Sequence, residues 1–458
     1  MKFKAYASRV VTVVKTSLIP SRILVLGFAS IILLGALLLT LPLASRNGLS
    51  LPFLDALFTA TSAVCVTGLV VVDTGTHFTG FGQFVIIALI QIGGLGIMTM
   101  STLTALILGK RIGLKSRILI QESFNQFNLA GLVRLVINVI LVTFIFEFVG
   151  GLILSLRFLA DFPAPRAFAF GFFHSVSSFC NAGFDLFGQI HGKFSSITHY
   201  VNDWTVTLTI GALIVCGGLG FPVISELVKY PKTKRLSLHA KVVLRITAIL
   251  IVAGAAAIAA IEYTNARTLS GLSFNGKFLG SLFQSITPRT AGYNTLDISQ
   301  MRPASWFIMI ILMFIGASPS STGGGVKTTT VGVLMAAVAA TVRGKQDVTM
   351  FERRFPQDLI NKAFTLTFIA ISWVCFVTLV MSLVEPFSFI RLFFEVMSGF
   401  GTVGLTTGIT PALTTLSRVL IIITMFIGRL GPLTVMVAIT DVEHSKSGRY
   451  ITDQVMIG

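Results

Sequence analysis

Long runs of residues without a charged side chain determine the solvent in which this chain folds. Four runs contain 21 to 24 residues each, and a fifth contains 36 residues. A helix needs roughly 20 apolar residues to cross the hydrocarbon core of a bilayer. With 54% hydrophobic and 12% charged residues, the chain is too apolar for an ordinary soluble domain. We therefore expect a multi-pass membrane protein. The runs are 23–43, 205–225, 303–326, 363–384 and 74–109.

The basic residues are distributed unevenly between the loops. If residue 1 lies inside the cell, 23 of the 35 Lys and Arg residues fall in inside segments and nine in outside loops. This asymmetry follows the positive-inside rule and predicts that both termini are cytoplasmic. The net charge of +17 therefore reflects topology, and we expect no nucleic-acid partner. Basic inner loops are also compatible with anionic headgroups of membrane lipids.

A short pattern occurs four times along the chain. In each copy a Phe is followed four residues later by Ser or Thr, and nine or ten residues later by Gly. The four glycines are 115, 109 and 112 residues apart. Each copy follows a full-length apolar span, contains an apolar stretch better suited to a re-entrant segment than to a crossing, and precedes another span. The copies are 58–68, 173–183, 283–292 and 394–404.

Four such units predict an all-α membrane protein with eight transmembrane helices and four re-entrant half-helices around a pseudo-fourfold pore. Eight crossings return the C-terminus to the side of the N-terminus, as the charges require. The predicted pore repeats are 21–110, 111–229, 230–345 and 346–440, flanked by cytoplasmic segments 1–20 and 441–458.

The repeated loops themselves indicate a cation site. Broken backbone cannot face lipid, because each unpaired N–H or C=O group costs several kcal/mol there. The four loops are therefore expected to meet around an axis, with the half-helix C-terminal dipoles favouring a cation. Glycine can turn consecutive carbonyls toward that axis, as in filters that replace the hydration shell of K⁺. The predicted filter residues are Val66, Thr67, Gly68, Asn181, Ala182, Gly183, Thr290, Ala291, Gly292, Thr402, Val403 and Gly404.

These four loops resemble the pore loops of the Trk/Ktr/HKT superfamily of potassium transporters. The quoted segments are Val66-Thr-Gly-Leu69, Asn181-Ala-Gly-Phe184, Thr290-Ala-Gly-Tyr293 and Thr402-Val-Gly-Leu405. Without two extra N-terminal spans, the chain is most similar to the membrane subunit of bacterial Ktr systems. The resemblance implies K⁺ uptake across the bacterial plasma membrane, often activated by Na⁺, without an organic cofactor. It also implies a homodimer with one pore per protomer, docked on a cytosolic nucleotide-binding RCK ring, KtrA.

The third unit contains an interruption below its filter loop. Three consecutive glycines, a proline and four Ser or Thr residues cannot hold a straight helix in lipid, and a helical pattern resumes at about Thr328. One interpretation is a kink patched by hydroxyl groups. The other, supported by the resemblance, is a mobile loop that gates the path. Its residues are Gly316, Ala317, Ser318, Pro319, Ser320, Ser321, Thr322, Gly323, Gly324, Gly325 and Lys327, the last of which lies near the path or extends to the inner surface.

Two charged residues are predicted to lie inside the membrane. Arg429 follows Arg418 by eleven residues, or about 16 Å along a helix, which indicates a functional role. We expect it to contact carbonyls or hydroxyls of the segment 316–327 and to raise the barrier to cations in the closed state. Glu147 contacts a polar protein surface, or else the boundary of its span is misplaced. Arg289 is expected to brace nearby backbone and to point away from the pore.

Three acidic residues follow their filter glycines closely, at Asp73, Asp185 and Asp297. They are predicted to lie at the outer mouth, where they concentrate cations or cap the loops. The sequence contains no HExxH, Walker or Rossmann glycine pattern, so we expect no enzyme. An alternating-access cation carrier remains as an alternative because such carriers also use broken helices, and so does a structural subunit that conducts nothing.

Overall fold

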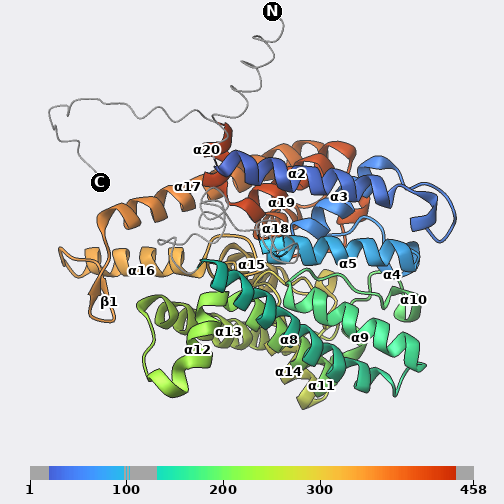
Figure 1. The fold of residues 1–458 in the computed structure, drawn as a ribbon, viewed down its shortest axis with the longest axis horizontal. Helices are drawn as coiled ribbons and strands as arrows, with labels where there is room; N and C mark the ends of the chain where they lie inside the picture. Colours follow the sequence, from blue (N-terminus) through green and yellow to red (C-terminus); the bar gives the residue numbers. More distant parts are fainter. Residues whose placement is uncertain (1–19, 97–98, 101–102, 104–131, 440–458) are drawn as a thin grey trace, which may run out of the picture.

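The structure, a computed structural model, describes residues 20–96, 99–100, 103 and 132–439 (Figure 1). The expected segment 441–458, nearly all of 1–20 and the boundary between 110 and 111 lie outside these residues. The first unit contains α2 (Pro20–Leu39), η1 (Pro42–Ala44), α3 (Phe53–Val64), α4 (Thr74–His77) and α5 (Gly80–Leu95). The second contains α8 (Leu132–Phe158), α9 (Ala164–Phe179), α10 (Gly188–His191), η2 (Thr198–Tyr200), α11 (Trp204–Leu219) and α12 (Phe221–Thr233).

The second half of the chain repeats this order of long and short helices. The third unit contains α13 (Leu238–Glu262), α14 (Phe274–Ile286), η3 (Ile298–Gln300), α15 (Pro303–Phe314) and α16 (Thr328–Val342). A hairpin of β1 (Thr349–Met350) and β2 (Arg353–Arg354) leads to the fourth unit. That unit contains α17 (Gln357–Val384), α18 (Phe389–Gly401), η4 (Thr410–Ala412), α19 (Thr415–Leu430) and α20 (Pro432–Ile439). Helices α3, α9, α14 and α18 are the short helices that contain the repeated pattern.

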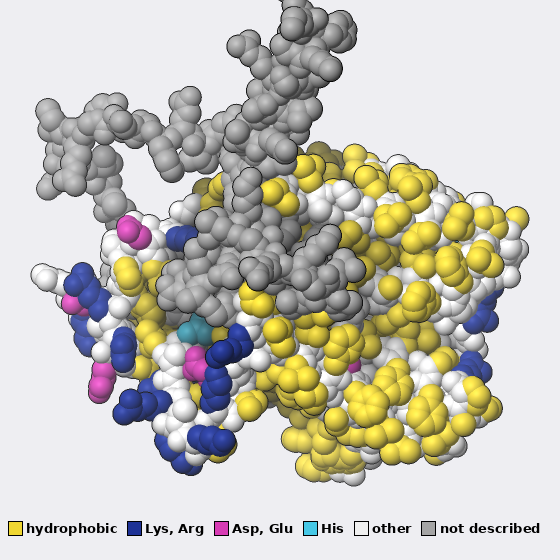
Figure 2. Space-filling model, in the orientation of Figure 1, with side chains coloured by type: hydrophobic (Ala, Val, Ile, Leu, Met, Phe, Trp, Pro, Cys, Tyr) yellow, Lys and Arg dark blue, Asp and Glu magenta, His cyan; other side chains and the backbone are white. Residues whose placement is uncertain are grey.

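The surface of the molecule matches a membrane environment. Among the described residues, α2, α8, α13 and α17 are long and apolar enough to cross a bilayer, and the number of such spans is up to six when each of two bent helix pairs is counted as one span. Large apolar side chains such as Leu34, Phe148 and Phe368 are more than half exposed. Figure 2 shows hydrophobic side chains over most of the visible face, while most Lys and Arg side chains gather at one end, near α12 and α16. Such apolar surface is suited to lipid rather than water.

The first and last units lie side by side and close the arrangement. In Figure 1 the blue helices α2 and α3 lie next to the red helix α19, and α3 contacts α19 while α2 contacts α20. An ion pair joins these units, since Arg418 Nη1 lies 2.5 Å from Asp55 Oδ1. The chain therefore closes on itself, and each short helix has neighbours from its own unit and from an adjacent unit.

A second repeated motif ends the last long helix of three units. Helices α5, α11 and α19 each end before a glycine of a Gly-X-Leu-Gly sequence, and these glycines, Gly96, Gly220 and Gly431, have φ values of 83°, 90° and 87°. The chain then bends by 103° between α11 and α12 and by 98° between α19 and α20. The uncharged run 205–225 was expected as one crossing, but the chain bends at Gly220 within it. Glycine permits this bend, because the φ of Gly220 is one that residues with a Cβ rarely adopt.

The first glycine of the same motif fixes each of these helices against its short helix. A Cβ added at Gly93, Gly217 or Gly428 would overlap the carbonyl oxygen of the last or penultimate residue of α3, α9 or α18. Only a residue without a side chain permits this approach. The motif therefore sets where the ends of the short helices lie, and with them the loops that follow.

Candidate functional site

The four loops share one unusual backbone conformation. Their first predicted filter residues all have positive φ, although none is glycine, and their glycines also have positive φ. Positive φ is uncommon for residues with a side chain and clusters at functional sites. The values are 50° at Val66, 60° at Asn181, 74° at Thr290 and 49° at Thr402, then 92° at Gly68, 68° at Gly183, 83° at Gly292 and 90° at Gly404. Four segments about 110 residues apart therefore fold in the same way.

The glycines join these loops into a closed ring. A Cβ added at Gly68 would lie 2.5 Å from the carbonyl oxygen of Ala182, and one added at Gly183 would lie 2.5 Å from that of Ala291. Continuing around the ring, a Cβ at Gly292 would overlap the carbonyl oxygen of Val403, and one at Gly404 would overlap that of Thr67. Each loop thus touches the next, and the fourth touches the first. The structure brings all twelve predicted filter residues together.

Hydroxyl groups of the short helices hold the ring from behind. These are the Ser and Thr residues found four positions after the Phe of each copy. In the first and fourth loops Ser62 Oγ and Ser398 Oγ accept hydrogen bonds from the N–H groups of Gly68 (3.0 Å) and Gly404 (3.1 Å). The repeated pattern therefore contains the filter glycine and the group that fixes its backbone.

The second and third loops use the same hydroxyl position differently. Ser177 Oγ donates to the carbonyl of Phe184 (2.9 Å), and Thr287 Oγ1 donates to that of Tyr293 (2.6 Å). The Phe184 carbonyl also accepts from the Tyr293 hydroxyl (2.9 Å). These two carbonyls belong to the residues directly after the ring glycines. The second and third loops therefore use the hydroxyl group to hold a carbonyl beyond the glycine, whereas the first and fourth loops use it to hold the glycine N–H.

The segment 316–327 lies against the inner side of the ring. Gly324 N–H donates to Thr402 Oγ1 (3.1 Å), and a Cβ added at Gly323 would overlap the Thr290 hydroxyl. The loop ends pair with each other, since Gly316 N–H donates to the carbonyl of Val326 (2.9 Å). Two glycines of this segment therefore lie against two of the predicted filter residues, Thr290 and Thr402.

Neighbouring helix ends hold the rim of this segment. Ser318 and Thr322 N–H donate to the carbonyls of Gly218 (3.0 Å) and Gly217 (3.2 Å) at the end of α11. On the other side, Gly325 N–H donates to the carbonyl of Gly428 (3.3 Å). Carbonyls in the last turn of a helix lack partners within the helix. The segment thus occupies acceptors that the Gly-X-Leu-Gly ends leave available.

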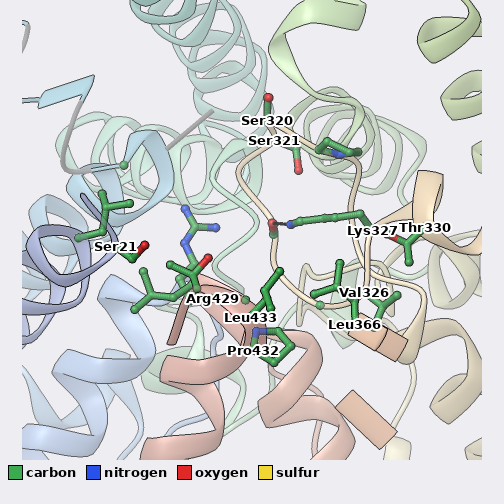
Figure 3. A pocket seen from close by; sticks show the side chains of 18 of the residues that line it. Ser21, Ser320, Ser321, Val326, Lys327, Thr330, Leu366, Arg429, Pro432 and Leu433 are labelled. Carbon is green, nitrogen blue, oxygen red and sulfur yellow. Dashed lines mark hydrogen bonds between the residues drawn. The ribbon is translucent and has the colours of Figure 1, made fainter. Parts of the chain in front are cut away.

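Two basic side chains lie at this segment and line a cavity of about 380 Å³ beneath it. Arg429 donates to the carbonyl of Thr322 and, on α5, to the carbonyls of Gly93 and Gly94, the last at 3.2 Å. Lys327 Nζ donates to the carbonyl of Gly323 (2.7 Å). Figure 3 shows the two side chains on opposite sides of the loop backbone. A cation that passed through the ring would meet both charges.

Sequence comparison places this geometry in a known family. The model of the TrkH family, described as cation transport proteins, matches residues 22–449. The chain belongs to the TrkH family of cation transport proteins. It is a helical membrane transport protein and not an enzyme.

Relatives within this family match over nearly their full length. The chain is 42% identical to the Ktr system potassium uptake protein B of Bacillus subtilis, over 96% of this chain and 97% of that protein. It is 39% identical to the potassium/sodium uptake protein NtpJ of Enterococcus hirae, over 97% and 98%. The crystal structure of the potassium transporter TrkH from Vibrio parahaemolyticus superposes with a TM-score of 0.70 at 17% identity, covering 91% of this chain and 83% of that one. That likeness supports the TrkH fold.

The three acidic residues expected at the outer mouth all cap backbone in this family member. Asp73 accepts from the N–H groups of Thr76 (2.8 Å) and Phe194 (2.9 Å). Asp297 accepts from Ser299 N–H (2.9 Å), and Asp185 from Phe187 N–H (3.0 Å). Burial and the nearby charge of Asp73 raise the pKa of Asp185 to about 7.

Other polar residues near the ring also find partners. Arg289 donates to the Thr247 hydroxyl on α13 (3.1 Å). Glu395, which is not among the predicted site residues, accepts from the hydroxyls of Thr406 (2.8 Å) and Thr410 beyond the fourth loop. Its position directly after the Phe of the fourth copy was a signal, because an acidic residue inside an apolar half-helix needs a buried partner.

Proposed function

We propose that the chain conducts K⁺ across the plasma membrane through one pore per chain. The observation that carries this proposal is the closed ring of four glycine loops, in which each glycine lies against a main-chain carbonyl of the next loop. Such a ring supplies oxygens that replace the water around a monovalent cation. The C-terminal ends of the four short helices add a negative potential at the same place.

The choice of potassium is supported by the relatives. Their names describe a potassium uptake protein and a potassium/sodium uptake protein. Each loop contributes a single glycine to the ring, which favours a short queue of ions and modest discrimination against Na⁺. We therefore also propose that Na⁺ accompanies or activates K⁺ uptake.

A gate formed by the segment 316–327 is the second part of the proposal. Its glycines lie beneath Thr290 and Thr402, and Arg429 and Lys327 add positive charge where the path would continue. Positive charge in a narrow, partly dry passage repels cations strongly. Flux then requires that the segment and the Arg429 guanidinium move apart.

The proposed assembly is a homodimer that binds a cytosolic nucleotide-sensing RCK ring, KtrA. The name of the Bacillus subtilis relative describes a Ktr system, which favours a multi-component transporter. Lys and Arg side chains gather at one end of the molecule (Figure 2), and this end is proposed to face the cytoplasm with both termini. The four pore repeats are proposed to span 21–110, 111–229, 230–345 and 346–440.

Ion flux through the purified protein in liposomes tests the proposal. Uptake of Rb⁺, a K⁺ substitute, is measured with K⁺ or Na⁺ as competitor. A pore gives rapid flux that K⁺ inhibits more strongly than Na⁺ does. Low turnover with obligatory exchange would instead identify an alternating-access carrier, and the absence of flux for every ion would contradict transport by this chain alone.

A further inference from the structure

Glu147 is a buried acidic residue that the proposed pathway does not use. It lies in the middle of α8, and 4% of its surface is exposed. Its Oε2 accepts from Gln91 Nε2 on α5 (3.2 Å), and its Oε1 accepts from the Cys180 thiol (3.7 Å). A carboxyl group at this depth is costly unless it is hydrogen bonded, and such residues are usually functional. The side chain joins α8 to two other elements.

Both partners of Glu147 adjoin the proposed machinery. Gln91 precedes Gly93 by two residues, and the carbonyls of Gly93 and Gly94 are the acceptors of Arg429 on α5. Cys180 is the C-cap of α9 and directly precedes filter residue Asn181. Gly94 packs on Cys180, since a Cβ added there would lie 2.7 Å from the thiol sulfur. The end of α5 is thus held by Arg429 on the cavity side and by Glu147 through Gln91 on the other.

We propose that Glu147 is a positioning residue that fixes the end of α5, and through it the Arg429 anchor. Carbonyls in the last turn of a helix have no partner within the helix. The carbonyls of Gly93 and Gly94 can accept from the Arg429 guanidinium only while the end of α5 stays in place. Without the Glu147 carboxyl, Gln91 Nε2 loses its acceptor and the Cys180 thiol keeps only Gln91 Oε1 (3.7 Å). The end of α5 then loses its tie to α8 and can shift. The guanidinium then holds the segment 316–327 less firmly. This inference rests on the gating role proposed above for Arg429.

Flux in liposomes tests it with three variants of α8. Glu147→Ala removes both hydrogen bonds and is expected to raise basal Rb⁺ flux by about fivefold, the lower end of typical coupling between sites. Glu147→Gln keeps an acceptor oxygen at the same place and is expected to retain wild-type flux. Ile145→Ala changes an exposed side chain on the same helix and is the matched control. If Glu147→Ala does not fold, Gln91→Met removes the α5 hydrogen bond from its other partner and is expected to raise flux.

A double-mutant cycle shows whether Glu147 acts through Arg429. Arg429→Ala alone is expected to raise flux, and adding Glu147→Ala to it is expected to change nothing further. Equal factors in both backgrounds, wild-type flux in Glu147→Ala, or an equal increase in Glu147→Gln would each overturn the positioning role while the gate stands. Unchanged flux in Arg429→Ala would overturn the gating role itself.

Discussion

Replacing Gly404 by Ala separates the two reasons for glycine in the ring. Gly404 has φ +90°, and an added Cβ would overlap the Thr67 carbonyl oxygen. Gly408, four residues later in the same loop, has φ +89°, and a Cβ added there would have no heavy atom within 4 Å. Alanine at either position incurs the same backbone cost, about 1 to 2 kcal/mol for a left-handed conformation. Only Gly404→Ala also displaces a ring oxygen.

The expected size of the effect follows from that oxygen. The overlap is relieved when the Thr67 carbonyl moves away from its place in the ring. A contact between a charged group and a neutral polar group contributes about 1.5 kcal/mol or more. Since 1.4 kcal/mol corresponds to a factor of ten, losing this contact should weaken K⁺ binding about tenfold in Gly404→Ala. The preference for K⁺ over Na⁺ should fall by at most that factor, because Na⁺ loses part of the same contact. Gly408→Ala should lose only the backbone cost of about 1 to 2 kcal/mol in stability and keep its ion preference.

Rb⁺ uptake into liposomes, with graded K⁺ or Na⁺ as competitor, measures this preference for both variants. The ratio of the two inhibitory concentrations is compared with that of the wild-type protein, and thermal unfolding checks that both variants fold. If Gly404→Ala keeps the wild-type ratio, or if Gly408→Ala loses it equally, the carbonyl of Thr67 does not belong to a selectivity filter.

Three further predictions test other parts of the site. Ser398→Ala leaves the Gly404 N–H without its acceptor, at a cost of about 1 to 3 kcal/mol, so the preference for K⁺ should fall in the same competition assay. Ser382→Ala, on the exposed face of α17, is the control and should leave that preference unchanged. Deleting most of 316–327 should increase Rb⁺ flux without changing its K⁺/Na⁺ ratio; loss of flux in a folded variant would contradict the gate. Because the pKa of Asp185 is raised from 3.8 to about 7, the folded protein takes up this proton before the unfolded chain does, and stability rises as the pH falls through 7. Asp185→Asn should therefore raise the melting temperature most at pH 8 and less at pH 5, and leave it nearly unchanged near pH 3, below the ordinary pKa of 3.8.

The sequence was sufficient for the membrane setting because uncharged runs such as 363–384 have one physical explanation. The sequence also located the loops. Positive φ at Gly68 and Gly292 favours glycine at these positions, and the four glycines recur at a recognisable spacing. The depth of Arg429 indicated that it needs a polar partner, and the segment 316–327 was proposed as that partner. The Arg429 acceptors at Gly93 and Gly94 could not be predicted, because pairing between units depends on how they pack.

The bends were missed although the sequence carried their signal. Gly-Gly-Leu-Gly at 93–96 and 217–220 and Gly-Arg-Leu-Gly at 428–431 form a repeat as regular as the filter pattern. Hydropathy could not reveal it, because both sides of Gly220 and Gly431 are apolar. The role of Ser62 and its equivalents was hidden for another reason, since a hydroxyl group in a half-helix can equally bond to its own helix.

The position of these motifs is compatible with one proposed gate in a chain of four repeated units. Gly94, Gly218 and Arg429 occupy the second position of the Gly-X-Leu-Gly motif in the first, second and fourth units, so a long side chain stands at this position in only one of the three motifs. The Arg429 guanidinium is shared between α5 and the carbonyl of Thr322. Withdrawal of the segment 316–327 removes one of these acceptors, which costs about 1.5 to 3 kcal/mol for a charged donor. If this segment is the proposed gate, that cost alone favours its closed position by roughly ten- to a hundredfold, a bias small enough for the proposed partner to reverse.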